Sequence, residues 1–81
     1  MALSHAQAME VAKRFNPSAG RKLWFGDNGT LLSSAEAHRL APDKGEVYVC
    51  RRPATGGAVE VARVTAEHVA AGREPAFGVP W

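Results

Sequence analysis

The chain is organised around two runs, Glu46-Val-Tyr-Val-Cys-Arg-Arg52 and Ala58-Val-Glu-Val-Ala-Arg-Val64, joined by Pro53-Ala-Thr-Gly-Gly57. Both runs are rich in β-branched and aromatic residues, and the segment between them contains proline and glycine. This arrangement is typical of a β-hairpin. With Thr55 to Gly57 as the loop, arginine faces glutamate across the strands, in the register Glu60–Arg52, Ala62–Cys50 and Val64–Tyr48.

This register also predicts which face of the hairpin is buried, because side chains alternate between the two faces of a strand. We expect one face to be core, since it carries Val47, Val49, Val59 and Val61. The other face has smaller and more polar groups, so we expect it to be partly exposed to water. Its residues are Tyr48, Cys50, Arg52, Ala58, Glu60 and Ala62.

A helix is predicted before this hairpin, from His5 to about Phe15. Ser4 and Gln7 have the spacing of a capping box at its start. Asn16-Pro17 ends it, because the residue before a proline is biased away from helical geometry.

A second hairpin follows the helix, with strands at 21–25 and 30–32. Asn28-Gly29 lies between them and favours a type I′ turn, in which both central residues have positive φ. Ser33 and Glu36 then form another capping box, which predicts a helix from Ser34 to about Leu40 that stops before Pro42.

The pattern of hairpin and helix recurs at the end of the chain. Thr65 is a predicted cap for a helix over 66–71, and Gly72 has the place of a left-handed C-terminal cap. The predicted fold is therefore α+β: an N-terminal helix followed by two ββα units, with an antiparallel sheet of about four strands and short helices packed on one face. Residues 1–72 form a single domain in this interpretation. Residues 73–81 form an irregular Pro/Gly-rich C-terminal tail, whose Phe77 and Trp81 either fold back onto the sheet or reach for a partner.

Composition narrows the class of protein. The 81 residues are 46% hydrophobic and 22% charged, as in an ordinary globular domain, and the formal net charge is +2. No apolar run approaches the roughly 20 residues of a membrane span, and Met1 to Leu3 does not resemble the start of a signal peptide. The single cysteine, Cys50, agrees with a reducing compartment. We expect a cytoplasmic protein without membrane contact, either a monomer or a weak homodimer.

The residue types that carry catalysis are not arranged in a recognisable set. His5, His38 and His68 lie far apart in the sequence, which does not match the spacing of a zinc site. Cys50 has no histidine or acidic partner at a recognisable spacing, so we interpret it as a small buried apolar residue. The glycines of the central loop lack the lysine and helix of a phosphate-binding loop. We therefore expect no enzymatic activity, no cofactor and no metal.

Basic pairs and one tryptophan remain as candidate binding groups. The pairs are Lys13-Arg14, Arg21-Lys22 and Arg51-Arg52, and together with a stacking aromatic they could contact nucleic acid. Acidic residues spread along the chain weaken that field, so a protein partner is the preferred hypothesis. Trp24 must point away from Phe25, which shares its face with Leu23. Tryptophan and arginine are typical interface anchors, and the predicted partner-binding residues are Trp24, Arg51, Arg52, Lys22 and Arg21.

Three features of the whole chain resemble those of a known class of small proteins. It is short, it has no signature motif, and its absent isoleucine, abundant alanine and excess of arginine over lysine indicate a GC-rich coding genome. In these respects the chain resembles the small phage-encoded anti-CRISPR inhibitors. The resemblance implies a non-catalytic protein of the bacterial host cytoplasm that docks on a host protein complex, such as a CRISPR effector, and blocks its binding of DNA. These inhibitors share no motif, so no functional residue is carried over. The alternative is a small basic nucleic-acid-binding or regulatory protein.

Overall fold

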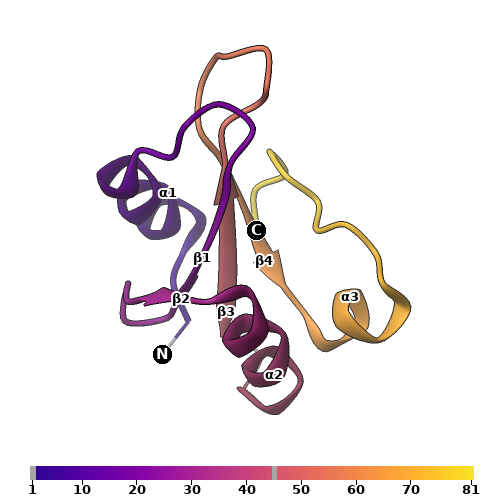
Figure 1. Ribbon diagram of the computed structural model, residues 1–81. Helices are drawn as coiled ribbons and strands as arrows, with labels where there is room; N and C mark the ends of the chain where they lie inside the picture. Colours follow the sequence, from indigo (N-terminus) through magenta and orange to yellow (C-terminus); the bar gives the residue numbers. More distant parts are fainter. Residues whose placement is uncertain (1, 45) are drawn as a thin grey trace.

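The computed structural model describes residues 2–44 and 46–81, and their order of elements is mixed α and β (Figure 1). The elements are α1 (His5–Phe15), β1 (Lys22–Gly26), β2 (Leu31–Leu32), α2 (Ser34–Lys44), β3 (Val47–Arg51), β4 (Glu60–Val64) and α3 (Ala66–Ala71). The strands form one antiparallel sheet in the order β2-β1-β3-β4. The predicted α+β class and four-stranded antiparallel sheet are confirmed. None of the helices described is long and apolar enough to cross a membrane.

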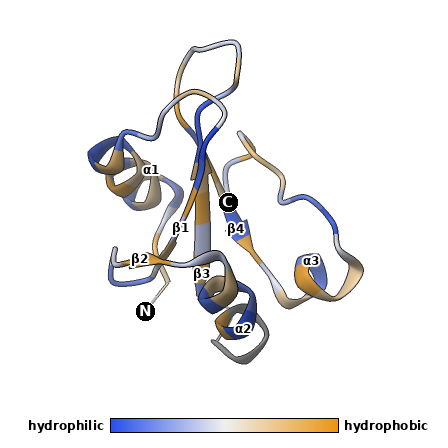
Figure 2. Ribbon diagram, in the orientation of Figure 1, coloured by the Kyte–Doolittle hydropathy of each residue, from blue (hydrophilic) through white to orange (hydrophobic). Residues whose placement is uncertain are grey.

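The helices cover both faces of the sheet, whereas the sequence predicted that they pack on one. On the face that we call the α1 face, Ala8, Val11 and Ala12 of α1 pack against Phe25, Tyr48, Cys50 and Val61. On the opposite face, the α2–α3 face, Ala37 and Val69 pack with Val47, Val49, Ala62 and Val64. Figure 1 shows the sheet between α1 on one side and α3 on the other, and Figure 2 shows hydrophobic residues concentrated in the strands and on the helices that flank them. The two short helices, α2 and α3, share one face as predicted, but α1 covers the other face, which was predicted to be partly exposed to water.

The central hairpin exists, but its predicted register was wrong by one residue. Glu60 pairs with Arg51 and Cys50 with Val61, where the sequence had suggested Arg52 and Ala62. The reason is that Arg52 is bound elsewhere: its guanidinium donates to the carbonyl of Pro17 at 2.9 Å and to the side chain of Asn16 at 2.7 Å. A third donation, at 2.7 Å, goes to the carbonyl of Gly57 in the hairpin loop.

The predicted wet face of this hairpin is buried. Tyr48 and Cys50 are both 0% exposed, because α1 packs over them. Val49 and Val61 are both core residues, but the shift in register places them on opposite faces of the sheet. The Tyr48 hydroxyl donates to Glu46 Oε2 at 3.0 Å and accepts from the Leu3 N–H at 2.8 Å, so this buried polar group is satisfied.

The first hairpin is confirmed, with a different turn from the one predicted. The Gly29 N–H donates to the Gly26 carbonyl, and the Gly26 N–H donates to the Thr30 carbonyl, each at 3.0 Å. Of the three loop residues only Gly29 has positive φ, at 77°. The loop is thus a three-residue connection with a left-handed third residue, and not the two-residue type I′ turn. The Asn28 side chain stabilises it by accepting from the Thr30 N–H at 3.1 Å.

The helix starts follow from local sequence. Capping boxes are present at Ser4 and Thr65, and Ser33 exchanges the same pair of hydrogen bonds with Glu36. Gly72 takes the left-handed conformation predicted for it, with φ of 64°. The end of α2 was predicted wrongly, since the helix continues to Lys44. α2 packs against β1, β3 and α3, and this packing outweighs the local bias against helix around a proline.

Candidate functional site

A cavity of about 320 Å³ lies on the α2–α3 face of the sheet, and we call it the Trp24 cavity. Its apolar lining comes from β1, β3, β4 and α3 and comprises Trp24, Val49, Val64 and Val69. The polar groups around it come from α2, α3, β1 and the tail and include Lys22, His38, His68, Arg73 and Glu74. Pro75 and Phe77 complete the wall on the side of the tail. An apolar hollow with a few polar groups at its edge is the usual composition of a binding site.

Trp24 lies at the centre of this face because of its place in β1. It pairs with Val49 of β3, and its neighbour Phe25 points to the α1 face, where it is 0% exposed. Trp24 itself is half-buried, and its ring centroid lies 6.2 Å from that of His38. Within the part of the chain that the structure describes, its indole N–H makes no hydrogen bond. The cavity therefore offers the ring of Trp24 as an apolar contact surface for a bound group.

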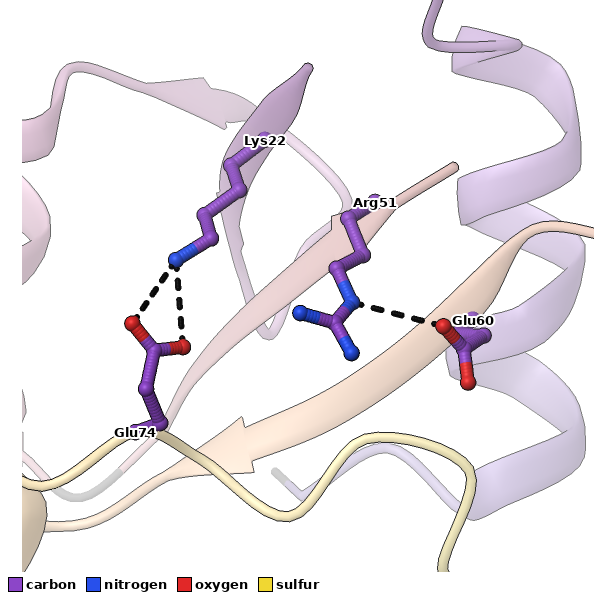
Figure 3. A network of polar contacts seen from close by, with 4 residues as sticks. All are labelled: Lys22, Arg51, Glu60 and Glu74. Atoms are coloured by element: carbon purple, nitrogen blue, oxygen red, sulfur yellow. Dashed lines mark hydrogen bonds and ion pairs between the residues drawn. The ribbon is translucent and has the colours of Figure 1, made fainter. Parts of the chain in front are cut away.

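A row of alternating charges borders the cavity on the same face (Figure 3). The Lys22 ammonium lies 3.0 Å and 3.1 Å from the two carboxylate oxygens of Glu74, in the tail. The Arg51 guanidinium donates to Glu60 Oε1 at 3.3 Å. Lys22 and Arg51 are partners across β1 and β3, and Arg51 and Glu60 are partners across β3 and β4. The register of three strands thus aligns these charges.

The tail is held against this row by one charged and one aromatic residue. The hydrogen bond and the positive charge of Lys22 lower the pKa of Glu74 below its ordinary value. Three residues later, the ring of Phe77 lies against the Arg51 guanidinium, whose carbon is 4.1 Å from the ring centroid. The Glu74 side chain is 68% exposed and that of Lys22 35%, so water competes for this ion pair.

Beyond Phe77 the tail passes β4 and reaches the start of α1. A Cβ on Gly78 would lie 3.3 Å from Glu60 Oε2, which shows how closely the tail approaches β4. The Trp81 ring stacks on Tyr48 at 5.7 Å and meets His5 edge-on at 4.9 Å. Its indole N–H donates to the Leu3 carbonyl at 3.0 Å. Both large aromatic residues of the tail fold back onto the body of the protein, which was one of the two predicted alternatives.

The two histidines at the cavity have local roles as well. His68 Nδ1 accepts from the Thr65 N–H at 3.1 Å and completes the cap of α3. His38 Nδ1 lies 2.7 Å from the Ser34 carbonyl, within α2. Each ring is therefore fixed by its Nδ1 and keeps its Nε2 for another contact. Among the described residues there is no group of three or more histidine, cysteine, aspartate or glutamate side chains that could hold a metal ion.

The structure brings three of the five predicted partner-binding residues together. Lys22, Trp24 and Arg51 share the α2–α3 face and line or border the cavity. Arg52 lies at the connection between α1 and β1, where its guanidinium is occupied by Asn16, Pro17 and Gly57. Arg21 is exposed beside a shallow hollow that also contains Phe15 and Leu23 of the α1 face.

Most residues of the site were not among the predicted binding residues, and they include His38, His68, Glu74 and Phe77. The spacing of the two histidines carries no signal, because α2 and α3 become neighbours only in the folded chain. Phe77 stood out in the sequence as a large apolar residue in an irregular segment, although its contact with Arg51 had no local signal.

Cys50 is remote from the cavity and belongs to the core of the α1 face. It is 0% exposed, and burial raises the pKa of its thiol to about 11. At neutral pH the group is therefore a protonated thiol, which agrees with its interpretation as a small apolar residue.

No family model, curated protein or solved structure matches this chain.

Proposed function

We propose that this chain is a non-catalytic binding protein that docks through its α2–α3 face on a host protein or nucleoprotein complex and inhibits it. The observation that carries the proposal is the Trp24 cavity, an apolar hollow beside aligned charges. Its volume of about 320 Å³ is at the lower end of the range of ligand pockets, roughly 300–1,000 Å³. A hollow of this size suits one large side chain of a partner.

The composition of the face supports a protein partner. Tryptophan and arginine are enriched among the residues that contribute most to protein–protein binding. The cations beside the cavity already have carboxylate partners, since Lys22 pairs with Glu74 and Arg51 with Glu60. A phosphate backbone requires unpaired cations, so this pairing favours a protein surface over a nucleic acid.

The anti-CRISPR resemblance suggests which partner to test first. A slightly basic inhibitor is a poor mimic of DNA, and we propose that it occupies a protein surface of a CRISPR effector complex and excludes DNA by its bulk. Purified effector complexes with guide RNA should lose binding of their target DNA in gel-shift assays when this protein is added in excess. Unchanged DNA binding by every complex tested would remove the CRISPR part of the proposal.

The docking face is tested independently of partner identity. Tagged protein should capture a partner from a bacterial lysate, and Trp24→Ala should weaken that capture at least tenfold while the variant remains folded. The matched control is Arg21→Ala, which removes an exposed cation at the start of the same hairpin and should change capture little. If Trp24→Ala and Arg21→Ala bind the captured protein equally well, the docking face is elsewhere.

A second function, nucleic-acid binding, is favoured by one observation. Lys13, Arg14 and Arg21 are exposed and form no ion pair with any residue that the structure describes. Titration of the protein against short single- and double-stranded oligonucleotides at low and moderate salt separates the two functions. Micromolar binding that falls steeply with salt would favour nucleic acid, because each neutralised phosphate releases counterions.

A further inference from the structure

The tail occupies the α2–α3 face in the manner of a bound peptide. It is irregular from Arg73 onwards, and it contacts the sheet through side chains. Glu74 places a carboxylate on Lys22, and Phe77 places a ring on Arg51. Between them, Pro75 lines the Trp24 cavity. Within this segment the Phe77 N–H donates to the Pro75 carbonyl at 3.0 Å, so the chain turns between the two contacts. The face thus already accepts an irregular, turned segment in which an acidic residue is followed, three positions later, by an aromatic one.

The contacts that hold this segment are of a kind that can exchange. The ion pair between Lys22 and Glu74 is largely exposed, and such pairs contribute little net affinity. Phe77 is half-buried and packs at the edge of the core of the α2–α3 face. Beneath the tail, the cavity remains unfilled over Trp24. A partner segment can reproduce both contacts of the tail and also fill this space.

We infer that the α2–α3 face is a peptide-binding site for an irregular partner segment with a carboxylate followed, three positions later, by an aromatic side chain, and that the tail is its intramolecular competitor. The inference rests on the proposed docking function and names the chemistry of the partner. The partner's carboxylate takes the place of Glu74 at Lys22, and its ring takes the place of Phe77 on Arg51. Lys22 remains to pair with the acidic residue of such a segment once Glu74 is displaced.

The tail itself supplies the probe. A fluorescein-labelled peptide of residues 73–81, acetylated and amidated, is titrated against the full-length protein and followed by fluorescence polarisation. In the variant Glu74→Gln/Phe77→Ala the intramolecular competitor is weakened. This variant should bind the peptide at least tenfold more tightly than the wild-type protein, whose own tail occupies the site. The same peptide with both residues replaced should not bind.

Two further variants locate the site. Addition of Lys22→Gln to the double variant should weaken peptide binding, by roughly two- to fivefold for an exposed ion pair. Addition of Arg21→Gln, a neighbouring cation that does not contact the tail, should leave it unchanged. If the double variant does not fold by circular dichroism, Glu74→Gln alone is used, since it changes one exposed group. It should bind the peptide about two- to fivefold more tightly than the wild type.

Equal binding of the peptide by the wild type and by a folded tail variant would overturn the inference, as would equal binding of the control peptide. Absence of saturable binding at millimolar peptide would also overturn it, and Phe77 would then have only a packing role, visible as a lower melting temperature. This failure is distinguishable from failure of the docking function. If only the peptide-binding inference fails, the peptide does not bind, but Trp24→Ala still weakens capture of the partner at least tenfold.

Discussion

The two faces of the sheet differ in what covers their central residues. On the α1 face, an amphipathic helix of 11 residues and the Trp81 ring, which stacks on Tyr48, cover Phe25, Tyr48 and Cys50, all 0% exposed. On the α2–α3 face, two helices and an irregular tail share the cover, and they leave a cavity of about 320 Å³ over Trp24. The valines beneath are buried just as well. The difference teaches that the ring of Phe25 is fully buried on one face, whereas the ring of its neighbour Trp24 stays partly exposed at the cavity that we propose as the docking site.

The adjacent residues Phe25 and Trp24 measure this difference most directly. Phe25→Ala should lower the free energy of unfolding by about 3–5 kcal/mol, because a fully buried ring is replaced by a cavity. Domains of this size have stabilities on the order of 5 kcal/mol, so this variant should be largely unfolded. Trp24→Ala should cost less, since its ring is only partly buried and lies at a cavity that already exists. Urea unfolding gives both values, and equal losses would contradict this difference in burial.

Neighbouring arginines extend the comparison to the ends of the strands. Arg52→Ala should lower the free energy of unfolding by about 1.5–3 kcal/mol, because it breaks the hydrogen bonds that join the α1–β1 connection to the hairpin loop. Arg51→Ala should cost about 0.5–1 kcal/mol, since it removes a partly exposed ion pair and a ring contact. Thermal and urea unfolding of the two variants check this order. A larger loss at Arg51 would show that the α2–α3 face contributes more to folding than we infer.

Burial of the Cys50 thiol on the α1 face predicts a loss of stability at alkaline pH. The Cys50 thiol has an ordinary pKa of 9.0 in the unfolded chain and of about 11 in the folded one. Between these values only the unfolded state ionises, so stability falls as the pH rises from 9 to about 11. Tyr48 acts in the same direction, since burial raises its pKa as well. Cys50→Ala should reduce the slope of stability against pH in this window, and an unchanged slope would contradict the assignment to Cys50.

The smallest effect is expected at acidic pH on the α2–α3 face. The pKa of Glu74 is lowered by Lys22 from its ordinary 4.5, so its contribution is present above pH 4.5 and is lost as the pH falls through the lower folded-state value. Release of the tail should then change the tryptophan fluorescence slightly, and a Trp81→Phe background assigns the part of the change that comes from Trp24. The effect is reversible and absent in Glu74→Gln, which cannot titrate. A wild-type signal that stays constant between pH 5 and pH 3 would show that the ion pair does not hold the tail.

Some features of the site could be predicted from sequence and others could not. Alternation along β1 placed Trp24 opposite Phe25 and on one face with Lys22, as observed. The separation of Arg51 and Arg52 follows from the same alternation. Two of the three acceptors of Arg52, however, lie 35 and 36 residues away in the chain. The contribution of α3 and the tail to the cavity arises from helix packing across the sheet.

The elements whose causes are local were determined by the sequence alone: the capping boxes at Ser4 and Thr65, the left-handed Gly72, and the existence of both hairpins. These depend on side chains that bond to the backbone within three or four residues, so neighbours in the chain are sufficient to specify them. Only the tertiary structure decided the hairpin register, the face covered by each helix and the position where the tail packs. Each of these depends on partners distant in sequence, and a shift of one residue in a strand exchanges its two faces. In this protein, the hydrogen bonds of the Arg52 guanidinium and the packing of α1 over Tyr48 favour the observed register.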